Sequence, residues 1–323
     1  MKLRASVIPV LTAALTIALT VSLATSCKDK IGPQPFPMPK VPVMMTSGPD
    51  VQNYLVSHFW QPFFAEDRVY SRDTALIGGV TRDEFQAAYT NYATMLMTAD
   101  VQRGLKAQEY LLAEAAKMKA ADPDSKVWES VLSISDAMLY DPQSPIRNEE
   151  MYIPVEEAKV TSPYTSDEEK ADAAALLPRL KLNRLGTPAA DFGFTMRNGR
   201  KMRLYDVKAD ILIMLFSNPG CENCKEVIDQ MSAMKGLDDL IASGKMAIVN
   251  VYPDADLEAW RDYAPIYPDN WYNGYNEALD VAGGLYNLRA IPSLYVLDEE
   301  KNVVFKDVAP VILFNYLNAA LAR

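Results

Sequence analysis

The sequence predicts an α/β domain preceded by an all-α domain, and three observations predict this division. Between about residue 50 and residue 185, apolar residues recur with the helical period of about 3.6. After Gly186, apolar runs of strand length alternate with helical stripes, which is the layer order of an α/β domain. The 323 residues are 49% hydrophobic and 23% charged, as in ordinary globular proteins.

Residues 1–26 have the pattern of an export signal. Lys2 and Arg4 precede an uncharged, apolar run that ends at Leu23-Ala24-Thr25-Ser26-Cys27. Small residues directly before a cysteine resemble the signal of bacterial lipoproteins, which implies cleavage before Cys27 and lipid modification of that cysteine. An uncleaved membrane-anchor helix is the alternative, because the run is long enough to span a bilayer. Both interpretations place the rest of the chain outside the cytoplasm.

Residues 27–47 are expected to form a tether, because closely spaced prolines favour an extended backbone over a packed element. These prolines are Pro33, Pro35, Pro37, Pro39 and Pro42. The helical domain is assigned to residues 48–183. Its helices are expected around the apolar stripes 51–59, 85–95 and 105–116, and at starts near Ser125, Asn148 and Ser166. Three acidic residues follow Ser166, as the dipole of a helix favours in its first turn.

The α/β domain is assigned to residues 184–323. Its strands are expected at 192–197, 201–204, 211–216, 246–252, 293–297 and 303–306. Its helices are expected from Glu222, and at 257–263, 276–286 and 311–321. The run 211–216 is apolar on both faces, which predicts a central, buried strand. Asn198-Gly199 predicts a type I′ hairpin turn, in which both residues have positive φ.

Two cysteines lie where the central strand gives way to a helix, in Pro219-Gly220-Cys221-Glu222-Asn223-Cys224. Two intervening residues place the sulfurs within one helical turn, so a reversible disulfide can close. Free N–H groups at the helix start stabilise a thiolate, which makes Cys221 the expected nucleophile and Cys224 the resolving thiol. The alternatives are a structural disulfide, which would stabilise little across so small a ring, and half of a zinc site, for which the sequence offers no second cysteine pair.

Ala290-Ile291-Pro292-Ser293 directly precedes a predicted strand, about seventy residues after the cysteines. With the CxxC motif and the segment 186–192, this loop makes residues 186–323 similar to the thioredoxin superfamily, specifically its exported, membrane-tethered thiol–disulfide oxidoreductases of the TlpA/ResA type. The resemblance implies that the peptide bond before Pro292 is cis, that Pro292 lies against the active-site disulfide, and that Ile291 offers backbone hydrogen bonds to a bound peptide. The helical segment resembles an uncharacterised domain that precedes thioredoxin-like domains in lipoproteins of Gram-negative bacteria, which implies no activity.

Several residues depart from the pattern of that superfamily. Leu215 stands where thioredoxin has a buried aspartate thought to take the proton of the resolving thiol, and Gly220 stands where a tryptophan is usual. Glu222 places a negative charge beside the nucleophile, which opposes a thiolate and favours a reductase over a strong oxidant. A peroxidase of the same superfamily is not expected, because Asn218 replaces its threonine.

We therefore expect a thiol–disulfide oxidoreductase of the cell envelope. It would reduce disulfides of exported proteins through Cys221 and Cys224, and a membrane electron donor would reduce it again. We expect a lipid anchor on Cys27, the outer membrane as its location, and a site that faces the periplasm or the cell surface. The alternative is a binding or assembly lipoprotein, whose helical domain engages a partner and whose thioredoxin fold is a scaffold.

The composition excludes several other classes of chemistry. A net charge of −10 offers no basic surface for phosphates, so nucleic acid is not an expected partner. No metal or nucleotide is expected, and the redox-active disulfide Cys221–Cys224 would be the only redox group. His58, the one histidine in the sequence, falls in an apolar helical stripe and is expected to be a core or surface residue.

Overall fold

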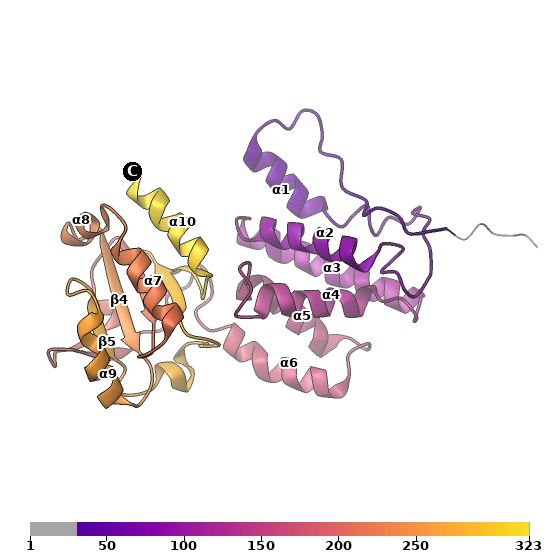
Figure 1. Cartoon of the computed structure of the whole chain (residues 1–323). Helices are drawn as coiled ribbons and strands as arrows, with labels where there is room; N and C mark the ends of the chain where they lie inside the picture. The colour runs from indigo at the N-terminus through magenta and orange to yellow at the C-terminus, as the bar shows by residue number, and fades with distance from the viewer. Residues whose placement is uncertain (1–30, 323) are drawn as a thin grey trace, which may run out of the picture. The chain divides into compact units, whose positions relative to one another are not determined.

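The computed structural model describes residues 31–322, and the first part of this range is helical (Figure 1). Its helices are α1 (Gly48–His58), α2 (Arg82–Leu96), α3 (Val101–Ala121), α4 (Val127–Ser135), α5 (Glu149–Thr161) and α6 (Asp167–Leu180), with a π-helical turn at Asp136–Tyr140. Among the helices of residues 31–322, none has the length and apolarity that crossing a membrane requires. The predicted signal peptide and Cys27 lie outside the described residues.

Side-chain caps explain where several of these helices begin. Asn148 accepts a hydrogen bond from the N–H of Met151 at the start of α5. Ser166 and Glu169 form a reciprocal capping box at the start of α6, which satisfies two otherwise unpaired N–H groups. Both helix starts were predicted and are confirmed. The helix expected near Ser125 begins two residues later, at Val127.

Part of the predicted tether is packed on the helical region. Phe36 is buried, and its ring contacts the rings of Phe59, Trp60 and Phe63 at centroid distances between 5.4 and 5.6 Å. Two residues earlier, the N–H of Gln34 donates to the carbonyl of Gly79. The expectation of an unpacked tether is therefore wrong at this point. Prolines do keep the backbone extended, but an aromatic side chain between them gains free energy by burial.

The C-terminal region is built on a seven-stranded sheet in the order β2-β1-β5-β4-β3-β6-β7. The strands are β1 (Gly193–Met196), β2 (Lys201–Arg203), β3 (Ile211–Phe216), β4 (Met246–Tyr252), β5 (Tyr272–Tyr275), β6 (Ser293–Leu297) and β7 (Val303–Phe305). The central strand β3 pairs in parallel with β4 and antiparallel with β6. The helices are α7 (Glu222–Ser232), α8 (Leu237–Ala242), α9 (Leu257–Tyr263) and α10 (Pro310–Leu321). The predicted fold class is confirmed.

Alternate residues of β3 belong to two apolar layers, one on each face of the sheet. Ile213 and Leu215 pack with the buried faces of α7 and α10, and Figure 1 shows these two helices on one side of the sheet. Leu212, Met214 and Phe216 pack into the other layer. This two-sided burial is what an uninterrupted apolar run predicts.

The segment after β4 differs from the prediction. Residues 272–275 form β5, which was not expected, and the helix predicted at 276–286 is wrong apart from a π-helical turn at Val281–Leu285. Asn276 instead bonds backbone on two sides, donating to the carbonyl of Gly193 and accepting from the N–H of Val281. Gly284 then adopts a φ of 136°, which no helix can continue through. The short helix α8 was also not predicted.

The hairpin between β1 and β2 forms as predicted, but its turn is of another type. Of Asn198 and Gly199, only Gly199 has positive φ, at 82°. The N–H of Gly199 donates to the carbonyl of Met196, and the N–H of Met196 donates to the carbonyl of Arg200. This is a tight turn closed by a left-handed glycine, so the predicted type I′ geometry is wrong.

Buried charges connect the helical region to the sheet region within one compact unit, Gly32–Arg323. The carboxylate of Glu149, at the start of α5, lies 2.8 Å from Arg289 Nε and 2.8 Å from Lys306 Nζ. Lys306 also donates to the carbonyls of Leu180 and Leu182, at 2.6 Å each. Burial raises the pKa of Glu149, and the charges of Lys306 and Arg289 offset only part of that rise.

Candidate active site

The two cysteines of the CxxC motif form a disulfide at the start of α7. Cys221 is the N-cap of that helix, and the Cα atoms of the two cysteines are 5.2 Å apart. The N–H of Cys224 points at the Sγ of Cys221, at 3.2 Å. Cys224 is 2% exposed, whereas Cys221 is half-buried. The sulfur that a substrate can reach is therefore that of Cys221, and it faces the N–H groups of a helix terminus.

The turn that leads into α7 explains the glycine in the motif. β3 ends at Phe216, and four residues later Gly220 adopts a φ of 71°. No atom would obstruct a Cβ at this position, so the requirement for glycine comes from the backbone conformation alone. A tryptophan, the residue that the resemblance implies at this position, would be strained. Pro219 is half-buried and Gly220 is exposed beside the disulfide.

The Ile291–Pro292 peptide bond is cis, as the resemblance implied. In the antiparallel register of β3 and β6, Ser293 lies opposite Phe216, so Pro292 comes beside the chain that runs from β3 to the cysteines. The carbonyl oxygen of Ile291 lies 3.8 Å from the Sγ of Cys221. Sheet register thus brings together two motifs that are far apart in the sequence.

The side chains around the disulfide are of contrasting kinds. Glu222 and Asn223, between the cysteines, are exposed. Leu215 is fully buried in the apolar layer that also contains Val227 and Met231 of α7. The strand position where thioredoxin has its buried aspartate therefore carries no ionisable group in this chain.

A buried polar chain follows β3 and was not predicted. The hydroxyl of Ser217 donates to Asn250 Oδ1 at 2.6 Å, and Asn250 Nδ2 donates to Asn273 Oδ1 at 3.2 Å. All three residues are buried. The chain ties the end of β3 to β4 and β5, and so fixes the strand end from which the CxxC turn departs. The signal available in the sequence is Asn250, a polar residue in the middle of an apolar strand.

Residues of the helical region border the disulfide, which sequence reasoning also missed. A cavity of about 330 Å³ is lined by Asn223 of the motif, by Ile291 and Pro292, and by residues of the segment 141–147. We call this segment the 141–147 loop. Nothing in the sequence indicated that this loop would lie beside the cysteine motif.

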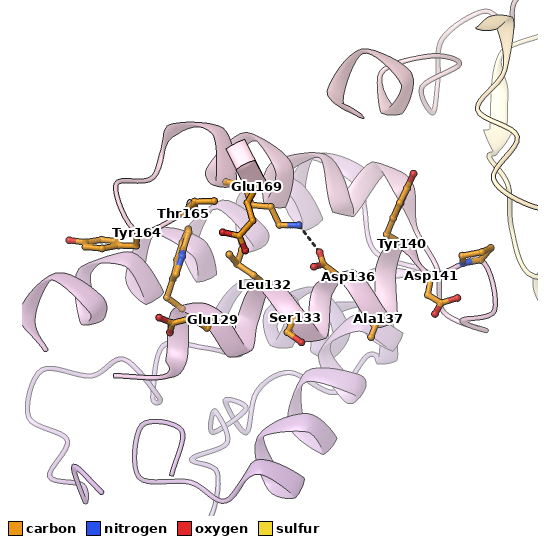
Figure 2. A pocket seen from close by; sticks show the side chains of 13 residues that line it. Glu129, Leu132, Ser133, Asp136, Ala137, Tyr140, Asp141, Tyr164, Thr165 and Glu169 are labelled. Carbon is orange, nitrogen blue, oxygen red and sulfur yellow. Dashed lines mark hydrogen bonds and ion pairs between the residues drawn. The ribbon is translucent and has the colours of Figure 1, made fainter. Parts of the chain in front are cut away.

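A larger cavity, of about 620 Å³, lies in the helical region (Figure 2). Figure 2 shows the carboxylates of Glu129, Asp136 and Glu169 around it. Lys159 also lines it and pairs with Asp136 at 2.7 Å and with Glu156 at 2.6 Å. Burial lowers the pKa of Lys159, but its hydrogen bonds to these two carboxylates raise the pKa by more than burial lowers it. The ammonium form therefore persists. Pro142 lines both cavities.

The remaining predicted site residues lie elsewhere or outside the described range. His58 ends α1, where its ring stacks on Tyr54 and its Nδ1 lies 2.8 Å from the Tyr54 carbonyl. These contacts are local to the helix. Cys27, the predicted lipidation site, is outside the described residues.

Comparisons with known proteins match both regions of the chain. Residues 13–183 match the family described as domain of unknown function DUF5106. A thioredoxin-like protein from Bacteroides caccae, known from its crystal structure, is 31% identical over 88% of this chain and 99% of that one, with a TM-score of 0.72.

Other matches cover the sheet region. The C-terminal domain of an uncharacterized protein from Bacteroides fragilis is 36% identical over 42% of this chain and 98% of that one, with a TM-score of 0.40. The thioredoxin domain of a thiol-disulfide oxidoreductase from Bacteroides vulgatus is 20% identical over 43% of this chain and 98% of that one, with a TM-score of 0.38. A search of curated proteins finds no match.

Proposed function

The chain belongs to the thioredoxin-like proteins that carry an N-terminal DUF5106 domain, and we propose that it is a thiol–disulfide oxidoreductase acting through Cys221 and Cys224. One observation carries the proposal. A disulfide with one accessible and one buried sulfur stands at a helix N-terminus, beside the cis peptide bond before Pro292. A disulfide that only stabilised the fold would not need one sulfur to be accessible while the other is buried.

The geometry supports a two-step exchange when the pair is reduced. The thiolate of Cys221 attacks one sulfur of a substrate disulfide, and the other substrate sulfur leaves as a thiolate and takes up a proton. The thiolate of Cys224 then attacks the Sγ of Cys221, which releases the second substrate sulfur and forms the Cys221–Cys224 bond. The substrate gains two electrons and two protons, and the cysteine pair loses them. Because Leu215 is apolar, the proton of Cys224 passes to another group or to water.

The cellular setting of the proposal follows from the N-terminal sequence. A signal peptide that ends before Cys27 would deliver the protein to the cell envelope, and two acyl chains would hold it stably at a membrane. Its substrates would be disulfide-containing envelope proteins. Each turnover leaves the cysteine pair oxidised, so a membrane dithiol donor would have to supply two electrons. Glu222 beside the nucleophile favours this reducing direction.

Mixed-disulfide trapping tests the proposal. Cys224→Ser removes the thiol that resolves the intermediate, so envelope proteins should accumulate as disulfide adducts of Cys221, visible on non-reducing gels and lost on adding a reductant. The double variant Cys221→Ser, Cys224→Ser is the matched control and should trap none. Wild type should also reduce insulin when a dithiol donor is supplied.

The reduction potential of the pair tests the direction. A value near −270 mV, as in thioredoxin, supports a reductase, and one near −120 mV an oxidase. If no adduct forms and insulin is not reduced, the proposal is wrong and the binding or assembly lipoprotein becomes the better interpretation. In that case Cys221→Ala would leave the cellular phenotype intact, while deleting residues 50–180 would abolish it.

A further inference from the structure

We propose that the 141–147 loop of the DUF5106 domain forms one wall of the substrate site and selects disulfides whose reactive cysteine is flanked by an apolar side chain. This inference rests on the proposed function, because it names the substrate class of the same disulfide. It assigns to the helical domain a direct part in recognition of the substrate.

The cavity that carries the inference is continuous with the cysteine motif. Its walls include Asn223, which stands between the cysteines, the Ile291–Pro292 turn, the 141–147 loop and the first turns of α10. A substrate sulfur bonded to Cys221 would place its neighbouring residue at the mouth of this cavity. The volume of about 330 Å³ lies within the range of ligand pockets and admits a large side chain.

The 141–147 loop is held in place by buried hydrogen bonds. The guanidinium of Arg147 is buried and donates from Nε to the carbonyl of Asp307 and from Nη2 to that of Val308, both at 2.8 Å. Its Nη1 donates back to the carbonyl of Pro142, within the loop. Ser144 closes the loop from the other side by donating to the carbonyl of Met138 at 2.6 Å.

Asp307, to which the loop is attached, also holds the Ile291–Pro292 turn on the other side of the cavity. The carboxylate of Asp307 accepts a hydrogen bond from Ser293 Oγ at 2.7 Å, directly after Pro292. Its other oxygen pairs with Arg289, two residues before the Ile291–Pro292 turn. The loop and the turn are therefore attached to one residue, and the cavity between them keeps a defined width. A preformed cavity discriminates between side chains better than a flexible one.

The chemistry of the walls favours an apolar side chain. Most of the lining is aliphatic, aromatic or proline, and it includes Val311 and Phe314 of α10. Val311 is 50% exposed, which leaves apolar surface open to a ligand. Of the polar members, Gln143 and Glu226 are exposed, whereas Arg147 and Asp307 are buried and bonded to each other or to neighbouring groups.

The charge at the rim disfavours acidic neighbours. Glu226 lines the cavity and Glu222 stands beside Cys221, and both are exposed. The cation that lines the cavity, Arg147, directs its donors to backbone carbonyls. An aspartate next to the substrate cysteine would meet two carboxylates and an apolar wall. The expected order of preference is therefore leucine above lysine, and lysine above aspartate.

Peptide disulfides that differ at one position test this inference. Three peptide pairs carry leucine, lysine or aspartate next to the cysteine, and hydroxyethyl disulfide serves as a substrate without a flanking residue. The full chain is first reduced with a dithiol, and its rate constant toward each substrate is measured by chromatography. Wild type should reduce the leucine peptide about tenfold faster than the aspartate peptide, given the free energy of burying one such side chain.

Variants of the exposed Gln143 separate the loop from the rest of the site. Gln143→Trp should fill the cavity and lower the ratio of the leucine-peptide rate to the hydroxyethyl disulfide rate about tenfold. Gln143→Lys should raise the aspartate-peptide rate and lower the lysine-peptide rate. Gln61→Trp changes an exposed glutamine of the helical region outside the cavity, and should change no rate.

The outcomes distinguish this inference from the proposed function. If wild type reduces neither the peptides nor hydroxyethyl disulfide, the proposed function fails. If wild type reduces all of them and both Gln143 variants show the same ratios between the peptide rates as wild type, the inference alone is overturned. An equal loss on hydroxyethyl disulfide and on the peptides would also overturn it, because the loop would then act on the cysteines and not on the flanking residue.

Discussion

At the scale of single residues, the two cysteines differ in exposure although only two residues separate them. Cys221 caps α7 and is half-buried, while Cys224 lies one turn into the helix with 2% of its surface exposed. Helix geometry imposes this difference, because the first turn places one side chain at the helix end and the other against the sheet. The CxxC spacing alone could therefore predict the roles, but not the backbone φ that requires Gly220.

Differential alkylation measures this asymmetry. In the reduced protein at pH 7, iodoacetamide should modify Cys221 at least about tenfold faster than Cys224, because thiolate character and access both favour Cys221. Peptide mass spectrometry of samples taken over time gives the two rates. The single variants Cys221→Ser and Cys224→Ser report each remaining thiol separately. Equal rates for the two thiols would contradict the assignment of nucleophile and resolving thiol.

Tyr89 predicts a loss of stability at high pH. Burial raises its pKa from 10.0 to about 12, although its hydrogen bond with the Ser135 hydroxyl lowers it. A pKa raised on folding contributes stability that is complete below pH 10 and is lost as the pH rises toward 12. Wild type should therefore lose about 1–1.5 kcal/mol more than Tyr89→Phe between pH 9 and pH 11, as measured by urea unfolding.

The phenylalanine variant is a suitable reference for this measurement. Ser135 Oγ still donates to the carbonyl of Val131 when the tyrosine hydroxyl is removed, so the serine hydroxyl keeps a partner. The cost of the substitution at pH 7 should be about 1 kcal/mol, that of one hydrogen bond. Parallel curves for the two proteins across the alkaline range would rule out the raised pKa of Tyr89.

At the scale of elements, β5 depends on a close approach of backbone to backbone. A Cβ added at Gly274 would lie 2.8 Å from the carbonyl oxygen of Thr195 in β1 and 2.8 Å from the Phe194 ring. The Thr195 carbonyl belongs to the backbone of β1, so it cannot move aside as the end of a flexible side chain can. β1 pairs with β5 at this point, so the glycine is what allows the two strands to pair.

A matched pair of glycine variants tests this explanation. Gly274→Ala should lower the free energy of unfolding by about 1–3 kcal/mol, because the new methyl group forces β1 and β5 apart. Gly193→Ala in the neighbouring strand introduces a Cβ that would lie no closer than 3.9 Å to its nearest neighbour, and should have little effect. Equilibrium urea unfolding compares them. Similar free energies for both variants would contradict the steric account.

Elements with a strong local pattern could be predicted, and those defined by distant partners could not. The buried strand β3 and the helices α5 and α6 have apolar runs or caps within their own sequences. β5 contains Asn273 and Gly274, which read locally as a turn, and it exists because it pairs with β4 and β1. The 141–147 loop precedes the predicted helix start at Asn148, but its place beside the cysteine motif depends on contacts with Asp307 and Val308.

At the scale of the whole molecule, buried ion pairs determine how the helical and sheet regions meet. Glu149 and Lys306 are buried, the side chain of Arg289 is 6% exposed, and Glu149 lies more than a hundred residues before both cations in the sequence. Asn287 adds a hydrogen bond to Glu149 at 2.8 Å. Nothing local to these residues distinguishes them from solvated surface charges, which is why sequence reasoning did not find this connection.

Removing one member of this network should be costly. Glu149→Ala leaves Lys306 and Arg289 buried with fewer partners, so the free energy of unfolding should fall by about 3 kcal/mol or more. Limited proteolysis should also cleave the chain faster between the two regions. The exposed pair Lys201–Glu277 supplies the control, and Glu277→Ala should leave the unfolding midpoint unchanged. Equal stability of the two variants would mean that the buried network does not hold the regions together.

The packing of Phe36 would limit the distance between the folded protein and a lipid anchor on Cys27. If Cys27 carries the lipid proposed for it, the chain from that cysteine to the buried Phe36 ring spans at most about 30 Å when fully extended. An unpacked tether as far as Ser47 would span about 70 Å. Phe36, and the helices on which it packs, would therefore stay nearer to a lipid on Cys27 than an unpacked tether would allow.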